Sequence, residues 1–274
     1  MNIYGIPSTE DHPKNALIRE AINKYGASIV GFAETNICWN KTKGKDRWEE
    51  RSRGWWENMR SITAHNTLES PKKHYQPGGT MMITRGSPTF RIKQCGVDPS
   101  NMGRWCWKVY SGRSTVTTRV ITAYRPCMSK GLTSTYIQQR RILDAKKINI
   151  CPRLKMIDDL TSAIKEWLDN GDQIILMMDL NDDVLRSIAN AKLNEIGLKE
   201  SITNRHTDQH PYATCNRGTR AIDGIYTSNT IEIQKGGYLP FNSLPTDHRA
   251  IWTEVTLGNL CGNDMAPIHN PQAR

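Results

Sequence analysis

The sequence has no paired-cysteine motif, no long apolar run and no internal repeat, and each absence narrows the class of protein. Seven cysteines make an odd count without a Cys-x-x-Cys pair, which predicts reduced thiols inside a cell instead of a disulfide framework. The first residues lack the apolar stretch of a signal peptide. The longest apolar stretch, near residues 174–178, is far too short to span a bilayer. We therefore expect a soluble, intracellular protein with no membrane partner.

Charge is distributed unevenly along the chain. The 274 residues include 37 Lys and Arg against 27 Asp and Glu, a formal net charge of +10, which suits a polyanionic partner. Residues 85–155 hold fifteen cations and two acids, whereas residues 158–183 hold eight acids and one lysine. Aromatic residues lie between the cations, so we expect the basic segment to contact nucleic acid, although tryptophan pairs are more often buried in cores. The aromatics in question are Trp105, Trp107, Tyr110 and Tyr124.

Local sequence patterns predict helices interspersed with strands. Helices are expected at 15–25, 135–147, 153–170 and 183–196, and strands at 28–33, 78–84, 105–110, 115–124, 173–178, 221–227 and 248–255. Residues 41–60 are either an exposed helix or a loop with half-buried tryptophans. The mixture of a hairpin with single crossover strands predicts an α/β fold of two packed sheets with helices outside.

Polar residues stand at the ends of these strands. Glu34 follows the strand at 28–33, Asp179 follows the strand at 173–178, and Asp223 lies in the strand at 221–227. Each carboxylate alone could be an ordinary polar strand end, but the ordered set favours a site. Hydrolysis of a phosphodiester needs a cation, an activated water and stabilisation of the leaving oxygen. Carboxylate oxygens suit Mg²⁺ or Mn²⁺, and no cysteine-rich zinc arrangement competes.

Further side chains complete this chemistry. His248, next to Asp247, can hydrogen-bond a phosphate oxygen, and Asp223 can fix its tautomer and raise its pKa. Asn181 can direct its amide from the same strand end as Asp179. The end of the strand at 115–124 could place the phenol of Tyr124 and the guanidinium of Arg125 on the phosphate.

These motifs resemble, in order, those of the endonuclease/exonuclease/phosphatase superfamily, which includes pancreatic-DNase-like nucleases and abasic-site endonucleases. The resemblance covers nearly the whole chain and implies a four-layer α/β/β/α sandwich of two packed mixed sheets. The matching segments are Asn2-Ile-Tyr-Gly5, Glu34, Tyr124-Arg-Pro126, Met178-Asp179-Leu-Asn181, Ile222-Asp223 and Thr246-Asp247-His248.

The resemblance also implies a role for each site residue. Glu34 would be the principal ligand of Mg²⁺, or of Mn²⁺ in its place, with Asn2 and Asp247 beside it. Asp179 would activate or orient the water, and Asp223 would orient His248. The phosphate would be held by Asn181 and His248 with help from Tyr124. The cations expected to contact nucleic acid are Arg113, Arg119, Arg125 and Arg220.

The chain departs from the family pattern at three positions, of which Thr246 is a mild change because it replaces the usual serine and keeps a hydroxyl. Asn2 stands almost at the first residue, so the strand that normally leads into this motif is missing. Met178 replaces the usual glycine, where its side chain could crowd the backbone near the metal. We expect residues 1–257 to form the catalytic domain and residues 258–274 to form a C-terminal tail or linker.

Within the superfamily, the chain most resembles the endonuclease domains of non-LTR retroelements, through Glu34-Thr-Asn-Ile-Cys-Trp39 and the last eight residues. That resemblance implies a monomeric domain that nicks DNA, with RNA not excluded, joined to a reverse transcriptase in a longer protein. It would act in the nucleus if the element is eukaryotic. An abasic-site repair endonuclease or a phosphoesterase of the same fold is one alternative. A catalytically inactive nucleic-acid-binding module is another.

Overall fold

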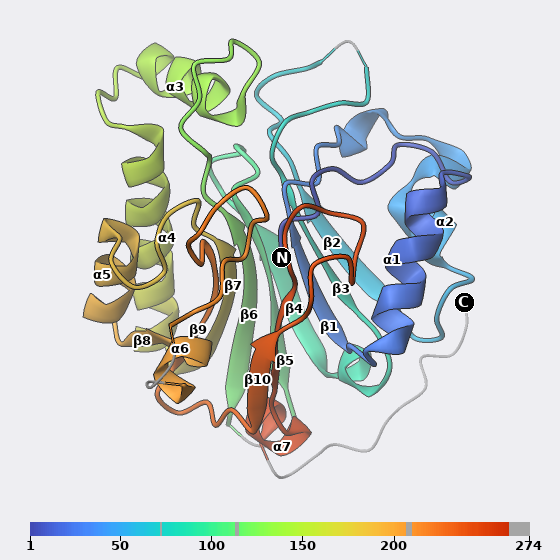
Figure 1. The fold of residues 1–274 in the computed structure, drawn as a ribbon, viewed down its shortest axis with the longest axis vertical. Helices are drawn as coiled ribbons and strands as arrows, with labels where there is room; N and C mark the ends of the chain where they lie inside the picture. The colour runs from blue at the N-terminus through green and yellow to red at the C-terminus, as the bar shows by residue number, and fades with distance from the viewer. Residues whose placement is uncertain (72, 113–114, 207–209, 263–274) are drawn as a thin grey trace.

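Two layers of β-strands pack face to face between layers of helices (Figure 1). The computed structural model describes residues 1–71, 73–112, 115–206 and 210–262. This arrangement confirms the expected α/β/β/α sandwich with flanking helices, and the six-stranded layer is the mixed sheet. Among those residues, none of the helices has both the length and the hydropathy that a bilayer crossing requires.

The first layer is a six-stranded sheet in which one central pair is parallel. β6 and β7 run parallel, because α3 and α4 form the crossover between them, and the other neighbours are antiparallel. In spatial order the strands are β4 (Ile92–Val97), β5 (Trp105–Ser111), β6 (Thr117–Tyr124), β7 (Asp172–Asp179), β9 (Asp223–Ser228) and β8 (Leu198–Glu200).

The second layer is divided into two small sheets. One has the order β1 (Ile29–Ala33), β3 (Thr80–Thr84) and β2 (Arg60–Ala64), and the other pairs β10 (Lys235–Tyr238) with β11 (Ile251–Glu254). All pairings within both sheets are antiparallel. In Figure 1 the amino terminus lies between the blue β1 and the red C-terminal strands.

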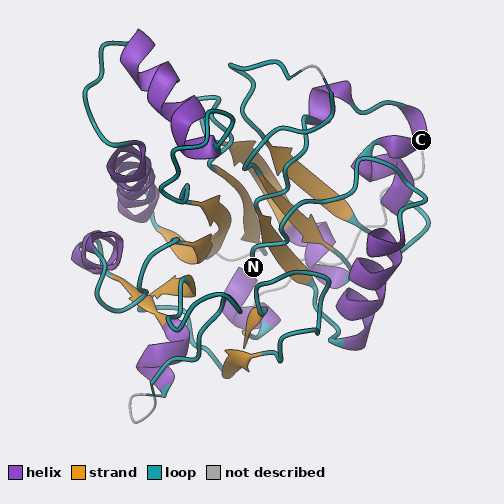
Figure 2. Ribbon diagram, turned by 45° about the horizontal axis from the view of Figure 1, so that its top comes forward, coloured by secondary structure: helices purple, strands orange, loops and turns teal. Residues whose placement is uncertain are grey.

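Helices cover the outer faces of both layers, as the tilted view in Figure 2 also shows. The outer face of the six-stranded sheet packs against α4 and α5, and the outer face of β1 and β3 packs against α1. The helices are α1 (Pro13–Lys24), α2 (Trp48–Ser52), α3 (Thr135–Ala145), α4 (Pro152–Asp169), α5 (Ile188–Glu195), α6 (Ser201–Arg205) and α7 (Leu257–Cys261), with 3₁₀ turns at Trp39–Lys41, Gly44–Asp46 and Ser87–Arg91.

Hydrophobic side chains fill each interface between layers. Met82 from β3 meets Val120 from β6 and Ile175 from β7 in the core between the two sheets. Leu260 and Cys261 of α7 join this core, so the expected tail begins within the packed part of the chain, and residues 263–274 of that tail lie outside the described residues. Met178 is buried in the cluster that faces α4, so its side chain does not crowd the site edge of the sheet.

The strand registers bring three predicted site residues into one row. Tyr124 on β6 is paired with Asp179 on β7, and Asp179 is paired in turn with Asp223 on β9. Paired residues on neighbouring strands lie about 5 Å apart. Residues separated by about 50 positions in the sequence therefore become neighbours at one edge of the molecule.

The predicted strands are present, residues 41–60 are closer to the loop alternative than to the helix, and one predicted helix begins later than expected. Residues 41–60 form short turns and the five-residue α2, with Trp48 buried among apolar side chains instead of lying on an exposed helix. The helix expected from residue 183 begins only at Ile188. The Asp183 carboxylate accepts the Leu185 and Arg186 amides in a turn, and Ser187 caps the helix. Such side-chain bonds compete with helical ones.

Part of the basic segment is buried, and the buried part cannot form the nucleic-acid surface expected of the segment. Five of its fifteen cations instead pair with acids of residues 158–183, because the two segments lie on adjacent strands and on α4. Arg119 meets Asp172 at 2.7 Å and Arg104 meets Asp159 at 2.8 Å. The buried cations of the segment are Arg91, Arg104, Lys108, Arg119, Arg125 and Arg153. Trp105, Tyr110 and Tyr124 are buried as well, and Trp107 packs against the core, so these aromatics do not form a base-stacking surface.

Replacement of Arg119 by alanine is expected to destabilise the fold by about 3 kcal/mol, because it leaves the Asp172 carboxylate, whose side chain is 11% exposed, without its ion-pair partner. The guanidinium also lies between the rings of Trp107 and Trp167, at 4.1 and 4.3 Å. Urea denaturation measures the loss. The control is Arg140→Ala, which removes a more exposed ion pair with Asp144 and should cost no more than about 0.5 kcal/mol. Equal losses in the two variants would contradict a structural role for Arg119.

Candidate active site

The candidate site lies where strand ends from both layers converge. Glu34 directly follows β1, Asp179 ends β7 and Asp223 begins β9. Glu34 adopts a left-handed backbone conformation with φ 56°, which is uncommon for a residue with a side chain and occurs often at functional sites. The turn is held by Asn36, whose side-chain oxygen accepts the Gly78 amide at 2.8 Å.

Asn2 connects the two layers at this point. Its amide nitrogen donates to Glu34 Oε2 at 2.6 Å and to Asp179 Oδ2 at 2.9 Å. The Asn2 carbonyl accepts a hydrogen bond from the Thr246 hydroxyl at 2.9 Å, which links the N-terminal segment to the residue before Asp247. Asn2 is 2% exposed, so one buried amide bridges carboxylates that follow strands of different sheets.

Asp179 is a buried carboxylate in an unfavourable electrostatic environment. Burial, together with the nearby charge of Asp223, raises the pKa of Asp179 to about 7. Hydrogen bonds from Asn2 and from the Asn181 backbone amide, at 2.9 Å, partly oppose this rise. A carboxylate that titrates near neutral pH is suited to accept a proton from water.

The side chain of Asn181 takes a different direction from the one expected. Its amide nitrogen donates to the Arg125 carbonyl at 2.7 Å and to Asp179 Oδ2 at 3.3 Å. The two hydrogens of the amide are thus directed at the protein, so in this conformation Asn181 positions Asp179 and does not point its donors at a phosphate.

Asp223 and His248 form the hydrogen-bonded pair that the sequence predicted. His248 Nδ1 lies 2.7 Å from Asp223 Oδ2, and the Thr214 hydroxyl accepts the Asp223 backbone amide at 3.0 Å. Burial lowers the pKa of His248, but the charge and hydrogen bond of Asp223 outweigh it and raise the pKa to about 9. Because Nδ1 is engaged, the imidazolium has Nε2 available for a substrate oxygen.

The donor set of the site fits a hard divalent cation. Burial raises the pKa of Glu34, and Asp223 Oδ1 and Asp247 Oδ1 are buried without a hydrogen-bond partner. Potential ligand atoms of Asp179, Asp223 and His248 all lie within 4.8 Å of one another. His248 Nδ1 already bonds Asp223, so this nitrogen is engaged within the protein. Glu34 and Asp247 supply the oxygens that a cation prefers.

Tyr124 closes the inner side of the site. Its phenol is 4% exposed at the end of β6, and burial raises its pKa well above the usual value, with Glu34 and Asp179 adding to the effect. Tyr124 is therefore a neutral hydrogen-bonding group at neutral pH and not a base.

The four arginines predicted to contact nucleic acid differ in exposure and in distance from the site. Arg125 is buried, and its guanidinium donates to the Leu180 carbonyl and to Asp182 at 3.1 Å each, so it does not face the site. Arg119 lies five residues before Tyr124 along β6, about 17 Å from the site. Arg220 is exposed in the loop before β9. Arg113 lies outside the described residues.

Two cations near the site were not predicted from the sequence. Arg217 pairs with Asp247 at 3.0 Å and lies over the ring of Tyr4, 5.5 Å from its centroid. The Lys14 ammonium donates to the Ile3 and Tyr4 carbonyls, and its pKa is lowered by burial, an effect that Asp247 opposes. Arg217 is far from Asp247 and Tyr4 in the sequence, and Lys14 is far from Asp247. The only local signal was the position of Arg217 three residues before Arg220, in the segment that precedes Asp223.

Comparison with known proteins identifies the fold. No family model and no curated protein sequence matches the chain. Solved structures do match: the 3′ phosphatase NExo from Neisseria bound to product DNA hairpin has 14% identity and a TM-score of 0.64, covering 93% of this chain and 97% of that one. An AP endonuclease from Archaeoglobus fulgidus has 14% identity and a TM-score of 0.63, with 93% and 96% covered.

The human Nocturnin catalytic domain with bound sulfate anion is also similar, with 14% identity, a TM-score of 0.60 and 93% of each chain covered. These neighbours belong to the endonuclease/exonuclease/phosphatase, or DNase-I-like, superfamily. At such identity the likeness establishes the fold alone, which is the fold that the motifs implied.

The buried acid–base groups predict that the metal-free protein becomes less stable as pH rises from 5 to 8. Asp179 and His248 both have folded-state pKa values, about 7 and about 9, above their unfolded values. Their stabilising contributions are complete below the unfolded pKa and are lost as pH rises through the folded one. The melting temperature in EDTA should therefore fall over this range.

Asp179→Asn is the matched variant for this prediction, because it keeps the shape of the side chain and removes its titration. The variant should show a smaller fall in melting temperature below pH 7 than the parent chain. A melting temperature that rises from pH 5 to pH 8 in the parent chain would contradict the assigned pKa directions.

Proposed function

We propose that this chain is a divalent-metal-dependent endonuclease that hydrolyses DNA phosphodiester bonds by nicking one strand. The observation that carries the proposal is the convergence of Asn2, Glu34, Asp179, Asp223 and His248 at one edge of the two sheets. That group combines an acceptor for a water proton, a cationic donor and carboxylates for a cation.

Each side chain of the site has a separate role in the proposed reaction. Asp179, held by Asn2 and Asn181, orients the attacking water and accepts its proton. Protonated His248, fixed by Asp223, donates from Nε2 to a phosphate oxygen and stabilises the negative charge that develops there. Mg²⁺, or Mn²⁺ in its place, would be held by Glu34 and Asp247 beside Asn2 and would neutralise phosphate charge. Tyr124 serves as a neutral donor at the same phosphate.

The proposed substrate is DNA, because several cations lie around the site and one structural neighbour, the 3′ phosphatase NExo, is bound to a product DNA hairpin. Arg220 is exposed, and Arg217 and Lys14 surround Asp247. By the motif resemblance we assign the chain to the endonuclease domains of non-LTR retroelements. On this assignment the domain is monomeric, is linked to a reverse transcriptase in its parent protein and, if the element is eukaryotic, acts in the nucleus.

The decisive experiment is nicking of supercoiled plasmid in Mg²⁺. Asp179→Ala should lower the nicking rate at least about 100-fold, since it removes the proton acceptor, and EDTA should abolish nicking by the parent chain. Binding to the same plasmid should change little, because Asp179 is 2% exposed. Thermal unfolding shows whether the variant is folded, and Asp179→Asn serves as the isosteric comparison.

The same assay separates the rival functions. Cleavage only of plasmid that contains abasic sites would favour a repair endonuclease, a function named for the Archaeoglobus neighbour. Binding without any nicking by the folded parent chain would favour a catalytically inactive module. Nicking of intact plasmid that survives Asp179→Ala would reject the role given to this carboxylate.

Arg220 provides a test of the DNA-binding surface. Arg220→Ala should weaken DNA binding and reduce the slope of log K against log salt concentration by about 0.9, the value for one lost phosphate contact. Arg119→Ala is the matched control, because its guanidinium is buried against Asp172, and its slope should equal that of the parent chain. Titration of labelled duplex at several salt concentrations gives both slopes. If Arg119→Ala lowers the slope and Arg220→Ala does not, the surface has been assigned wrongly.

A further inference from the structure

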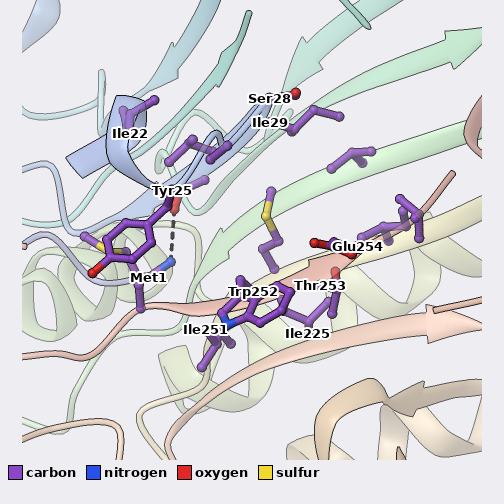
Figure 3. A pocket seen from close by; sticks show the side chains of 18 of the residues that line it. Met1, Ile22, Tyr25, Ser28, Ile29, Ile225, Ile251, Trp252, Thr253 and Glu254 are labelled. Atoms are coloured by element: carbon purple, nitrogen blue, oxygen red, sulfur yellow. Dashed lines mark hydrogen bonds between the residues drawn. The ribbon is translucent and has the colours of Figure 1, made fainter. Parts of the chain in front are cut away.

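A cavity with an aromatic and cationic lining lies beside α6 and β10, outside the candidate active site. It differs from the cavity drawn in Figure 3, whose mainly apolar lining includes Ile29 and Ile251. Its volume is about 500 Å³, within the range of roughly 300–1,000 Å³ that ligand pockets occupy. None of the residues assigned to the candidate site lines it. The side chains that give the lining its character are Tyr212, Tyr238, Phe241 and Arg249.

Arg249 is a half-buried cation without a counter-ion. Its guanidinium lies 4.2 Å from the ring centroid of Phe241 and 5.5 Å from that of Tyr212. Among the described residues it forms no ion pair, and its Nε is buried without a hydrogen-bond partner. Burying a charge is costly unless the charge is paired, and the buried Arg104 and Arg119 each meet an aspartate. The cavity therefore contains a cation that lacks an anion.

The position of Arg249 leaves this cation available to a ligand. A guanidinium that lies over an aromatic ring keeps N–H donors along its planar edge. Such an edge binds a phosphate through two parallel hydrogen bonds. The preceding residue, His248, makes different contacts, because its ring bonds Asp223. The cavity thus has a cation of its own, separate from those of the candidate active site.

Two tyrosine rings form another part of the lining. Tyr212 and Tyr238 meet edge to face, with ring centroids 5.7 Å apart and ring planes at 78°. Tyr212 is 58% exposed, and accessible aromatic faces of this kind stack on any nucleobase. Burial raises the pKa of Tyr238, and Glu200 adds to the rise while Arg249 opposes it. The Tyr238 phenol is therefore neutral at neutral pH and can donate or accept a hydrogen bond.

We propose that this cavity binds a nucleotide, with its phosphate on Arg249 and its base against the rings of Tyr212 and Tyr238. The unpaired cation and the aromatic faces match the two parts of that ligand, an anion and a flat ring. A free mononucleotide and one nucleotide of a nucleic-acid strand share this chemistry. Binding at the cavity does not require the nuclease reaction.

Isothermal titration calorimetry of the full chain with deoxyadenosine monophosphate (dAMP), in EDTA, tests the phosphate contact. Arg249→Gln should weaken dAMP binding at least about 10-fold, because it removes charge-assisted hydrogen bonds to the phosphate. Deoxyadenosine, which lacks the phosphate, should bind the parent chain with a similar loss of affinity. Arg217→Gln is the matched control, because it makes the same change at a cation that pairs with Asp247, and it should leave the dAMP affinity unchanged.

Tyr212→Ala tests the aromatic contact with a second variant. It should fold normally, because the Tyr212 side chain is 58% exposed, and thermal unfolding checks this for each variant. Loss of stacking should weaken dAMP binding about 5-fold or more, whereas Tyr212→Phe should retain the affinity of the parent chain. If Arg249→Gln fails to fold, the comparison of these two Tyr212 variants decides.

A short single-stranded oligonucleotide, titrated in the same way, separates the two sources of the nucleotide. Weakening of dAMP binding by Arg249→Gln identifies a site for a free nucleotide. Weakening of oligonucleotide binding alone identifies a site for one nucleotide within a strand.

Two outcomes would overturn the proposal. One is that the folded parent chain binds neither dAMP nor the oligonucleotide. The other is binding that Arg249→Gln and Tyr212→Ala both leave unchanged, and a loss in Arg217→Gln alone would then place the nucleotide at the candidate active site. Every titration contains EDTA and none measures nicking, so failure of the cavity and failure of the proposed nuclease function are distinguishable.

Discussion

The pairing of Asp179 with Asp223 on adjacent buried strands is the constraint on which the rest of the site depends. Two carboxylates at 2% exposure each repel one another and lose their hydration. The structure offsets this with the Asn2 amide on one and the His248 ring on the other. The register of β7 and β9 places the two carboxylates side by side. The position of the N-terminal segment and the protonation of His248 therefore both depend on that register.

Buried ion pairs explain why the net charge of residues 85–155 did not predict which cations lie on the surface near the site. The basic and acidic segments follow one another along the chain, and the fold places them side by side, on β5, β6, β7 and α4. Arg104 bridges Asp98 and Asp159 while 2% exposed. Five of the fifteen cations of residues 85–155 are thus paired with acids of residues 158–183, and the cations described near the site, Lys14 and Arg217, come from other parts of the chain.

The divided second layer bears on the same site. Glu34 follows β1 and Asp247 precedes β11, so two of the proposed metal ligands belong to the two separate sheets of the second layer. In the structure these parts are tied by the short segment at Asn2 and by its contact with Thr246. The strength of that tie determines how firmly Glu34 and Asp247 are held relative to each other.

The sequence alone determined the fold class, the main strands and the order of the polar residues that end them, because apolar periodicity and strand-end carboxylates are local patterns. It did not predict β2, β4, β8 or β10, which are short or only partly buried and carry weaker patterns. Tertiary structure alone decided that Arg119 and Arg125 are buried partners of acids, that Asn181 faces Asp179 and that Arg217 meets Asp247. These outcomes depend on strand register and loop packing, which bring together residues whose separation in sequence carries no signal of their contact.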